Sequence, residues 1–171
     1  MPLKILILSF ILISSCIPKK KFLESEFSNI VYNCPNNGNC DLEILENKSL
    51  LLNHDLGKLN YKLIDNKNKT VVRYQYSKDL DKSVVDGGYR EEIIFEINSK
   101  NTDNKIFDVD LQKTKMLFGR FCFCRGQTGF YKIINGNLKI KKGKKLNFKL
   151  NFKINEVPQI VNEIIVVNDK L

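Results

Sequence analysis

The 171-residue chain carries a formal net charge of +9 and 43% hydrophobic residues. That hydrophobic content is typical of a globular protein and argues against a disordered one. The length suggests a single domain. The chain lacks alanine and tryptophan and is rich in Ile, Phe and Tyr, which favours strands over helices.

The first predicted element is a short apolar segment behind one basic residue, in the opening MPLKILILSFILISSC. Residues 5–13 are far fewer than the about 20 needed to span a bilayer. Their length and flanks are those of the apolar core of a secretory signal. The segment ends in two serines and Cys16.

Residues 13–16, ISSC, resemble the lipobox of bacterial lipoproteins. The resemblance implies that the chain is cleaved before Cys16 and that acyl chains on Cys16 hold it to a membrane; two or three chains anchor a protein firmly. The alternative is an ordinary signal peptide with a cysteine at its end. The expected location is the cell envelope, at the periplasmic face or the outer membrane. The predicted parts are a signal peptide (1–15), a lipidated N-terminus and tether (16–33) and one β domain (34–171).

Three lysines follow the lipobox cysteine. In the tether, Lys19, Lys20 and Lys21 are placed to touch anionic headgroups, although a solvated linker explains them equally well. An extended tether of this length would let the folded domain stand away from the membrane.

The predicted strands follow from two-residue alternation of apolar and polar side chains. Alternation predicts strands at 41–46, 58–64, 70–76, 89–97 and 146–154, with a polar turn at 65–69. The tail 160–167 is predicted to be a last strand or a short helix. Asn135-Gly136 predicts a tight hairpin turn, because a type I′ turn needs positive φ at both central residues. We therefore expect an all-β fold, an antiparallel β-sandwich or open barrel of about eight to ten short strands.

Four cysteines remain beyond Cys16: Cys34, Cys40, Cys122 and Cys124. Outside the cytoplasm they are expected to oxidise. If 120–125 is a strand, the Cα atoms of Cys122 and Cys124 lie about 6.6 Å apart with parallel side chains, which disfavours a direct bridge. We expect that this pair bridges to Cys34 and Cys40 and staples the fold. The competing pattern is 34–40 with 122–124 strained or free.

Other chemistry for these cysteines is disfavoured. Their spacing does not match structural zinc sites. A redox role needs an exposed thiol of low pKa. Arg120 and Arg125 would lower such a pKa, but Phe121 and Phe123 suggest burial. We therefore expect no metal and no cofactor.

No catalytic constellation is evident, and the chain is predicted to be non-enzymatic. The single histidine, His54, lacks an activated nucleophile in its sequence context and is expected to be solvated. Asp108 and Asp110 alternate in a predicted strand, but their surroundings lack the spacing of a calcium loop. They are interpreted as an exposed strand edge.

A basic stretch lies at 132–153, with eight lysines and no acidic residue. Because these lysines alternate with apolar residues, they are interpreted as a solvated strand face, and nucleic acid is not expected as a partner. Weak attraction to anionic lipid or polysaccharide remains a functional alternative.

Three further motifs, NCPNNGNC, RFCFCRGQTGFY and NEVPQI, resemble small envelope lipoproteins of Bacteroidetes-type bacteria. The resemblance implies an envelope location and does not indicate any particular activity. The first functional hypothesis is a non-enzymatic binding or structural module with an envelope protein or polysaccharide partner. The second is an inhibitor or immunity lipoprotein that blocks a secreted enzyme through the loop 77–88. The third is a small hydrolase or metal-handling protein.

Overall fold

The computed structural model describes residues 31–79, 88–100, 103–142 and 146–167. The predicted signal peptide, Cys16, Lys19, Lys20 and Lys21 lie outside these residues, as does most of the loop 77–88. The elements are β1 (Val31–Tyr32), β2 (Gly38–Asp55), β3 (Lys58–Lys78), β4 (Tyr89–Asn98), β5 (Asn104–Phe107), the 3₁₀ helix η1 (Asp108–Thr114), β6 (Leu117–Cys122), β7 (Gly129–Lys132), β8 (Gly136–Lys142), β9 (Leu146–Phe152) and β10 (Glu163–Val167).

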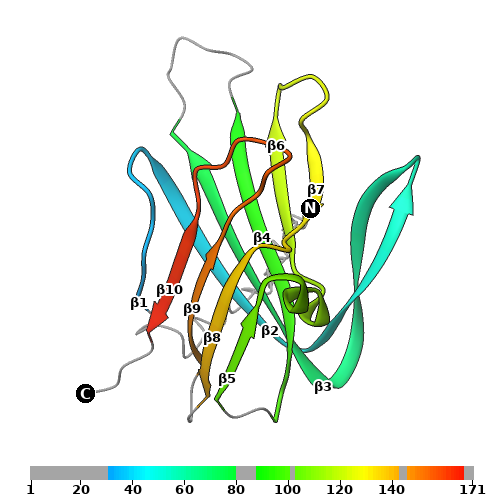
Figure 1. Ribbon diagram of the computed structural model, residues 1–171, viewed down its shortest axis with the longest axis vertical. Helices are drawn as coiled ribbons and strands as arrows, with labels where there is room; N and C mark the ends of the chain where they lie inside the picture. The colour runs from blue at the N-terminus through cyan, green and yellow to red at the C-terminus, as the bar shows by residue number, and fades with distance from the viewer. Residues whose placement is uncertain (1–30, 80–87, 101–102, 143–145, 168–171) are drawn as a thin grey trace, which may run out of the picture.

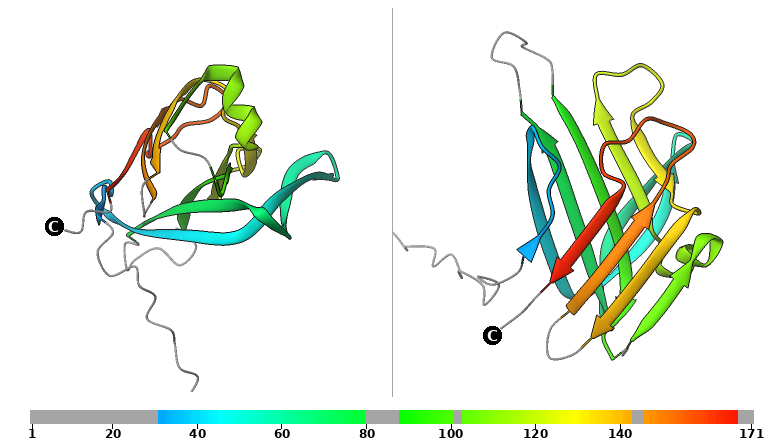
Figure 2. Two further views of the ribbon diagram at one scale, coloured as in Figure 1. Left: turned by 90° about the horizontal axis from the view of Figure 1, so that it is seen from below. Right: turned by 60° about the vertical axis from the view of Figure 1, so that its left-hand side comes forward.

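The strands form two five-stranded sheets in which every described pair is antiparallel. The first sheet has the order β1-β10-β9-β8-β5 and the second the order β2-β3-β4-β6-β7. Figures 1 and 2 show the two sheets as layers of one sandwich. The predicted antiparallel β-sandwich is confirmed. Val31 and Tyr32, which the sequence placed in the tether, already pair with β10.

The main core lies between the two sheets. In β9, Leu146, Phe148, Leu150 and Phe152 alternate with more exposed residues, as the sequence predicted. Phe148 meets Phe95 of β4 edge-on, with ring centroids 5.4 Å apart. Each large apolar side chain buried in this way contributes about 1.5–3 kcal/mol, so this layer is a major source of stability.

Strands β2 and β3 form one long hairpin. The predicted turn at 65–69 does not separate two strands, because β3 spans it; residues 66–69 have no register partner on β2 and form a bulge in the hairpin instead. The turn lies instead at Leu56 and Gly57, whose φ angles of 47° and 77° are those of a primed hairpin turn. An irregularity between Glu46 and Lys48 shifts the register, as a bulge does, and bends the hairpin.

The part of the hairpin beyond this bulge, residues 48–65, is called the arm below. It buries Leu50 against a second apolar cluster on the outer face of the second sheet, formed with Val71, Ile94 and Leu117. Tyr61 of the arm packs edge-on against Phe130 of β7, with ring centroids 5.2 Å apart. Figure 1 shows the arm on the same side of the molecule as β7. The second sheet is therefore covered on both faces in this region.

The predicted hairpin at Asn135-Gly136 is also wrong. β7 pairs with β6 in the second sheet, whereas β8 pairs with β9 and β5 in the first. The chain crosses between the sheets here because Ile133 and Leu138 are both buried in the main core. Gly136 has a φ of 150°, and a Cβ added there would lie 2.2 Å from the carbonyl oxygen of Asn151. Glycine is needed for a close approach rather than for a type I′ turn.

Candidate functional site

Both disulfides lie at one end of the sandwich, called the disulfide end below. Cys34 bridges Cys40 and Cys122 bridges Cys124, with Cα separations of 5.7 and 5.1 Å. Register places both bridges at the same end of the second sheet, because Gly38 pairs with Lys78 at the end of β3, and Cys122 pairs with Tyr89 at the start of β4. The prediction that the cysteines are oxidised is confirmed, and the preferred pairing between the two groups is wrong.

The predicted disulfide pairing is wrong because residues 120–125 do not form one extended strand. β6 ends at Cys122, and the chain then bends, which shortens the expected Cα separation enough for a direct bridge. The bend also turns Phe123 outward, where it is 92% exposed rather than buried as predicted. With both pairs bridged, these sulfurs are not available as thiolates for a metal or for redox chemistry that needs a free thiol.

A hollow of about 460 Å³ opens at the disulfide end and is called the disulfide-end hollow. It lies between the end of β6, the start of β4 and the segment that leads into β10. Its described lining residues are Lys78, Gly88, Tyr89, Arg120, Cys122, Phe123, Cys124, Pro158, Gln159 and Ile160. A second hollow adjoins it and shares Lys78, Tyr89, Cys122 and Phe123. Phe123 therefore borders both hollows.

A buried polar network forms the inner wall of the disulfide-end hollow. Glu91 is completely buried and accepts hydrogen bonds from the backbone N–H of Ile160 and Val161, at 2.6 and 2.7 Å. The hydroxyl of Tyr89 donates to Glu91 and accepts from Arg120 Nε at 3.3 Å. Burial, together with the hydrogen bond to Glu91, raises the pKa of Tyr89 to about 12, so the hydroxyl keeps its proton near neutrality. The network holds the 158–161 segment in place.

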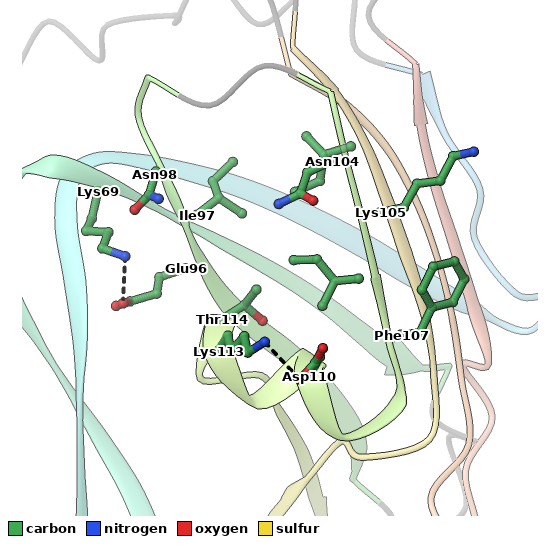
Figure 3. A pocket seen from close by; sticks show the side chains of 12 residues that line it. Lys69, Glu96, Ile97, Asn98, Asn104, Lys105, Phe107, Asp110, Lys113 and Thr114 are labelled. Atoms are coloured by element: carbon green, nitrogen blue, oxygen red, sulfur yellow. Dashed lines mark ion pairs between the residues drawn. The ribbon is translucent and has the colours of Figure 1, made fainter.

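A different pocket, of about 320 Å³, lies where β4 and β5 diverge beside η1. Figure 3 shows Ile97 and Asn104 directed toward it, with charged side chains around its rim. The rim charges pair internally: Lys69 with Glu96 at 3.5 Å, and Lys113 with Asp110 at 3.0 Å. Four of the five charged lining residues are therefore matched in pairs, and Lys105 is the one lining charge without an ion pair among the described residues.

Two glutamates on the outer face of β4, Glu92 and Glu96, are buried beneath the arm. Glu92 accepts from the Tyr61 hydroxyl at 2.6 Å, and burial together with this bond raises the pKa of Tyr61 to about 12. Burial alone would raise the pKa of Glu96. Hydrogen bonds from Ser49, the Leu50 amide and Lys115 outweigh it and hold the pKa below its ordinary value of 4.5. The two-residue alternation of the sequence could not reveal that these glutamates are buried, because it does not indicate which segment covers the outer face of the sheet.

The remaining predicted residues do not converge on either hollow. His54 is exposed, one residue before the end of β2 on the arm. Asp108 and Asp110 do not lie on a strand edge, because β5 ends at Phe107 and η1 follows; Asp108 accepts from the Gly136 N–H at 3.0 Å. The exposed lysines of β8 and β9 do alternate with buried residues, and Lys149 pairs with Glu163 at 2.7 Å.

Within the described part of the chain, His, Cys, Asp and Glu side chains form no group of three or more that could hold a metal ion. The same residues include no helix with the length and apolarity to cross a membrane. No protein family, curated protein or solved structure matches this chain. The function is therefore argued from the disulfide end itself.

Proposed function

We propose that the protein is a lipid-anchored binding module of the cell envelope that docks a partner protein through its disulfide end. The observation that carries the proposal is Phe123, which is 92% exposed on a loop closed by the Cys122–Cys124 bridge and borders both hollows. Exposed aromatic side chains beside a pocket are the residues that dominate binding energy at protein interfaces. A covalently closed loop loses little conformational entropy when it binds.

The anchored position rests on the lipobox at 13–16 and on the oxidised cysteines, which are typical of proteins outside the cytoplasm. The pairing of β1 with β10 is consistent with this anchored position. Val31 pairs with Val167 at the far end of β10 from the 158–161 segment that lines the hollow. A tether joined at Val31 would leave the disulfide-end hollow, whose described lining excludes Cys34 and Cys40, free to meet a partner.

The inhibitor or immunity function is a narrower form of the same proposal, in which the partner is a secreted enzyme. Lys78 and Gly88, which flank the loop proposed for this role, both line the disulfide-end hollow. Residues 80–87 lie outside the described residues. The docking surface is therefore proposed on the described residues alone, and no catalytic step is assigned to the protein.

Site-specific photo-crosslinking tests the docking surface. A benzophenone amino acid replaces Phe123 in the membrane-anchored protein, and the matched control carries it at Leu56, which is 97% exposed at the tip of the arm. A discrete adduct from position 123 that is missing from position 56 supports the proposal. No adduct from position 123, or the same adduct from both positions, contradicts it. The intact mass of membrane-extracted protein tests the acylation of Cys16 separately.

A further inference from the structure

We infer that the disulfide-end hollow is a recognition site for a carboxylate group, with Arg120 as its cation. The inference rests on the proposed function, because it names the chemistry by which the docking surface selects a ligand. Arg120 is only 7% exposed. Its Nε contacts the Tyr89 hydroxyl at 3.3 Å, its Nη1 donates to Gln127 at 2.6 Å, and its guanidinium carbon lies 5.3 Å from the centre of the Tyr89 ring.

Arg120 makes no direct ion pair with a carboxylate of the described residues. Glu91, its register partner on β4, reaches it only through the Tyr89 hydroxyl, which donates to Glu91 and accepts from Arg120 Nε. Both oxygens of Glu91 accept from the Ile160 and Val161 amides and the Tyr89 hydroxyl. A ligand carboxylate would therefore make the direct contact to the guanidinium that Glu91 does not make.

The guanidinium keeps one nitrogen without a protein partner among the described residues. Nε and Nη1 have protein partners, whereas Nη2 has none among the described residues. The single fully buried side-chain polar atom without a partner in the described chain is Asn53 Oδ1. Nη2 is therefore not fully buried, and Arg120 lines the disulfide-end hollow, from which a ligand would reach it.

The surroundings of Arg120 favour a ligand that carries one carboxylate next to an apolar group. The planar edge of a guanidinium, with its parallel N–H donors, matches a planar carboxylate. Lys78 adds positive charge at the mouth, and the described lining of both hollows contains no acidic residue. Phe123 and Ile160, 92% and 38% exposed, supply apolar surface beside the charge. A peptide C-terminus with an apolar last residue and a free aromatic acid both have this chemistry.

The test uses the full lipid-anchored chain in detergent micelles and three probes: N-acetyl-Leu-Phe with a free C-terminus, the same peptide as its C-terminal amide, and benzoate. Calorimetry is expected to show saturable binding of the free acid and binding of the amide about tenfold weaker or worse. Benzoate that binds as well as the peptide acid identifies a free carboxylate as the ligand. Benzoate that does not bind identifies a peptide C-terminus.

Two variants assign the effect to Arg120. Arg120→Gln is expected to abolish the preference for acid over amide, and Arg125→Gln, an exposed arginine in the same loop outside the lining, is expected to keep it. If Arg120→Gln does not fold, the NMR signal of the Arg120 Nε–H group in the wild-type chain replaces it, and this signal must shift on addition of the acid. The absence of saturable binding, or equal binding of acid and amide, overturns the inference. A crosslink from position 123 without carboxylate binding would overturn this inference alone and leave the docking proposal standing.

Discussion

Glu96 Oε2 lies 3.1 Å from Lys115 Nζ, and the same oxygen accepts from the Ser49 hydroxyl at 2.6 Å and the Leu50 amide at 2.8 Å. These contacts join the arm, strand β4 and the segment just before β6. Lys115 also donates to the Leu50 carbonyl. One buried carboxylate therefore fastens the base of the arm to the second sheet.

The stability of the protein is predicted to depend on the charge of Glu96. Its pKa is lowered in the folded state, so the carboxylate contributes stability above its ordinary pKa of 4.5, and this contribution is lost as pH falls through the lowered value. Glu96→Gln is expected to destabilise the protein by about 2 kcal/mol at pH 7, with the difference from wild type shrinking by pH 3. Urea denaturation at both pH values measures this. Glu46→Gln is the exposed control, and a difference that is independent of pH would contradict the prediction.

The second apolar cluster is predicted to hold the arm in place. Leu50→Ala removes a fully buried side chain from this cluster and is expected to cost about 2–5 kcal/mol. Leu51→Ala is the matched control, because Leu51 is 49% exposed and its truncation is expected to cost less than about 0.5 kcal/mol. Chemical denaturation gives both values, and limited proteolysis should cut the arm faster in Leu50→Ala alone. Equal effects of the two substitutions would mean that the arm does not pack against the sheet.

The crossing between the sheets is predicted to require glycine at 136. In Gly136→Ala the new Cβ meets the Asn151 carbonyl oxygen and the Phe152 backbone, and the φ of 150° is unfavourable for alanine, so a loss of about 3 kcal/mol is expected. Gly88→Ala is the control, because its Cβ meets no atom within 4 Å. Thermal unfolding compares the two. A tolerated Gly136→Ala would contradict the close approach of β8 to β9.

The disulfide pairing is predicted to give two bridges that each lie within one tryptic peptide. No lysine or arginine separates Cys34 from Cys40, and Cys122 and Cys124 share the peptide FCFCR at 121–125. Mass spectrometry without reduction should find each peptide lighter than its reduced form by two hydrogen atoms. A linked pair of peptides 22–48 and 121–125 would show the other pairing.

Because each disulfide closes only a short loop of the chain, its expected contribution to the stability is small. By the loop-entropy estimate each bridge contributes about 2 kcal/mol, compared with about 4.5 kcal/mol for a bridge between the two groups. Cys34→Ser/Cys40→Ser is therefore expected to fold and to lose about that smaller amount in urea denaturation. Failure to fold at room temperature would contradict the estimate.

Local alternation of apolar and polar side chains determined much of this protein by itself. The inward positions of Phe148, Leu150 and Phe152, the apolar face of β4 and the antiparallel β class all follow from a two-residue period, which each strand carries on its own. Tertiary packing decided the rest. Which sheet the chain joins after Asn135 and what covers Glu96 both depend on segments distant in sequence. Arg120 shows this most clearly, because only the arrangement of Tyr89, Glu91 and the 158–161 segment leaves it buried and without a direct ion pair among the described residues.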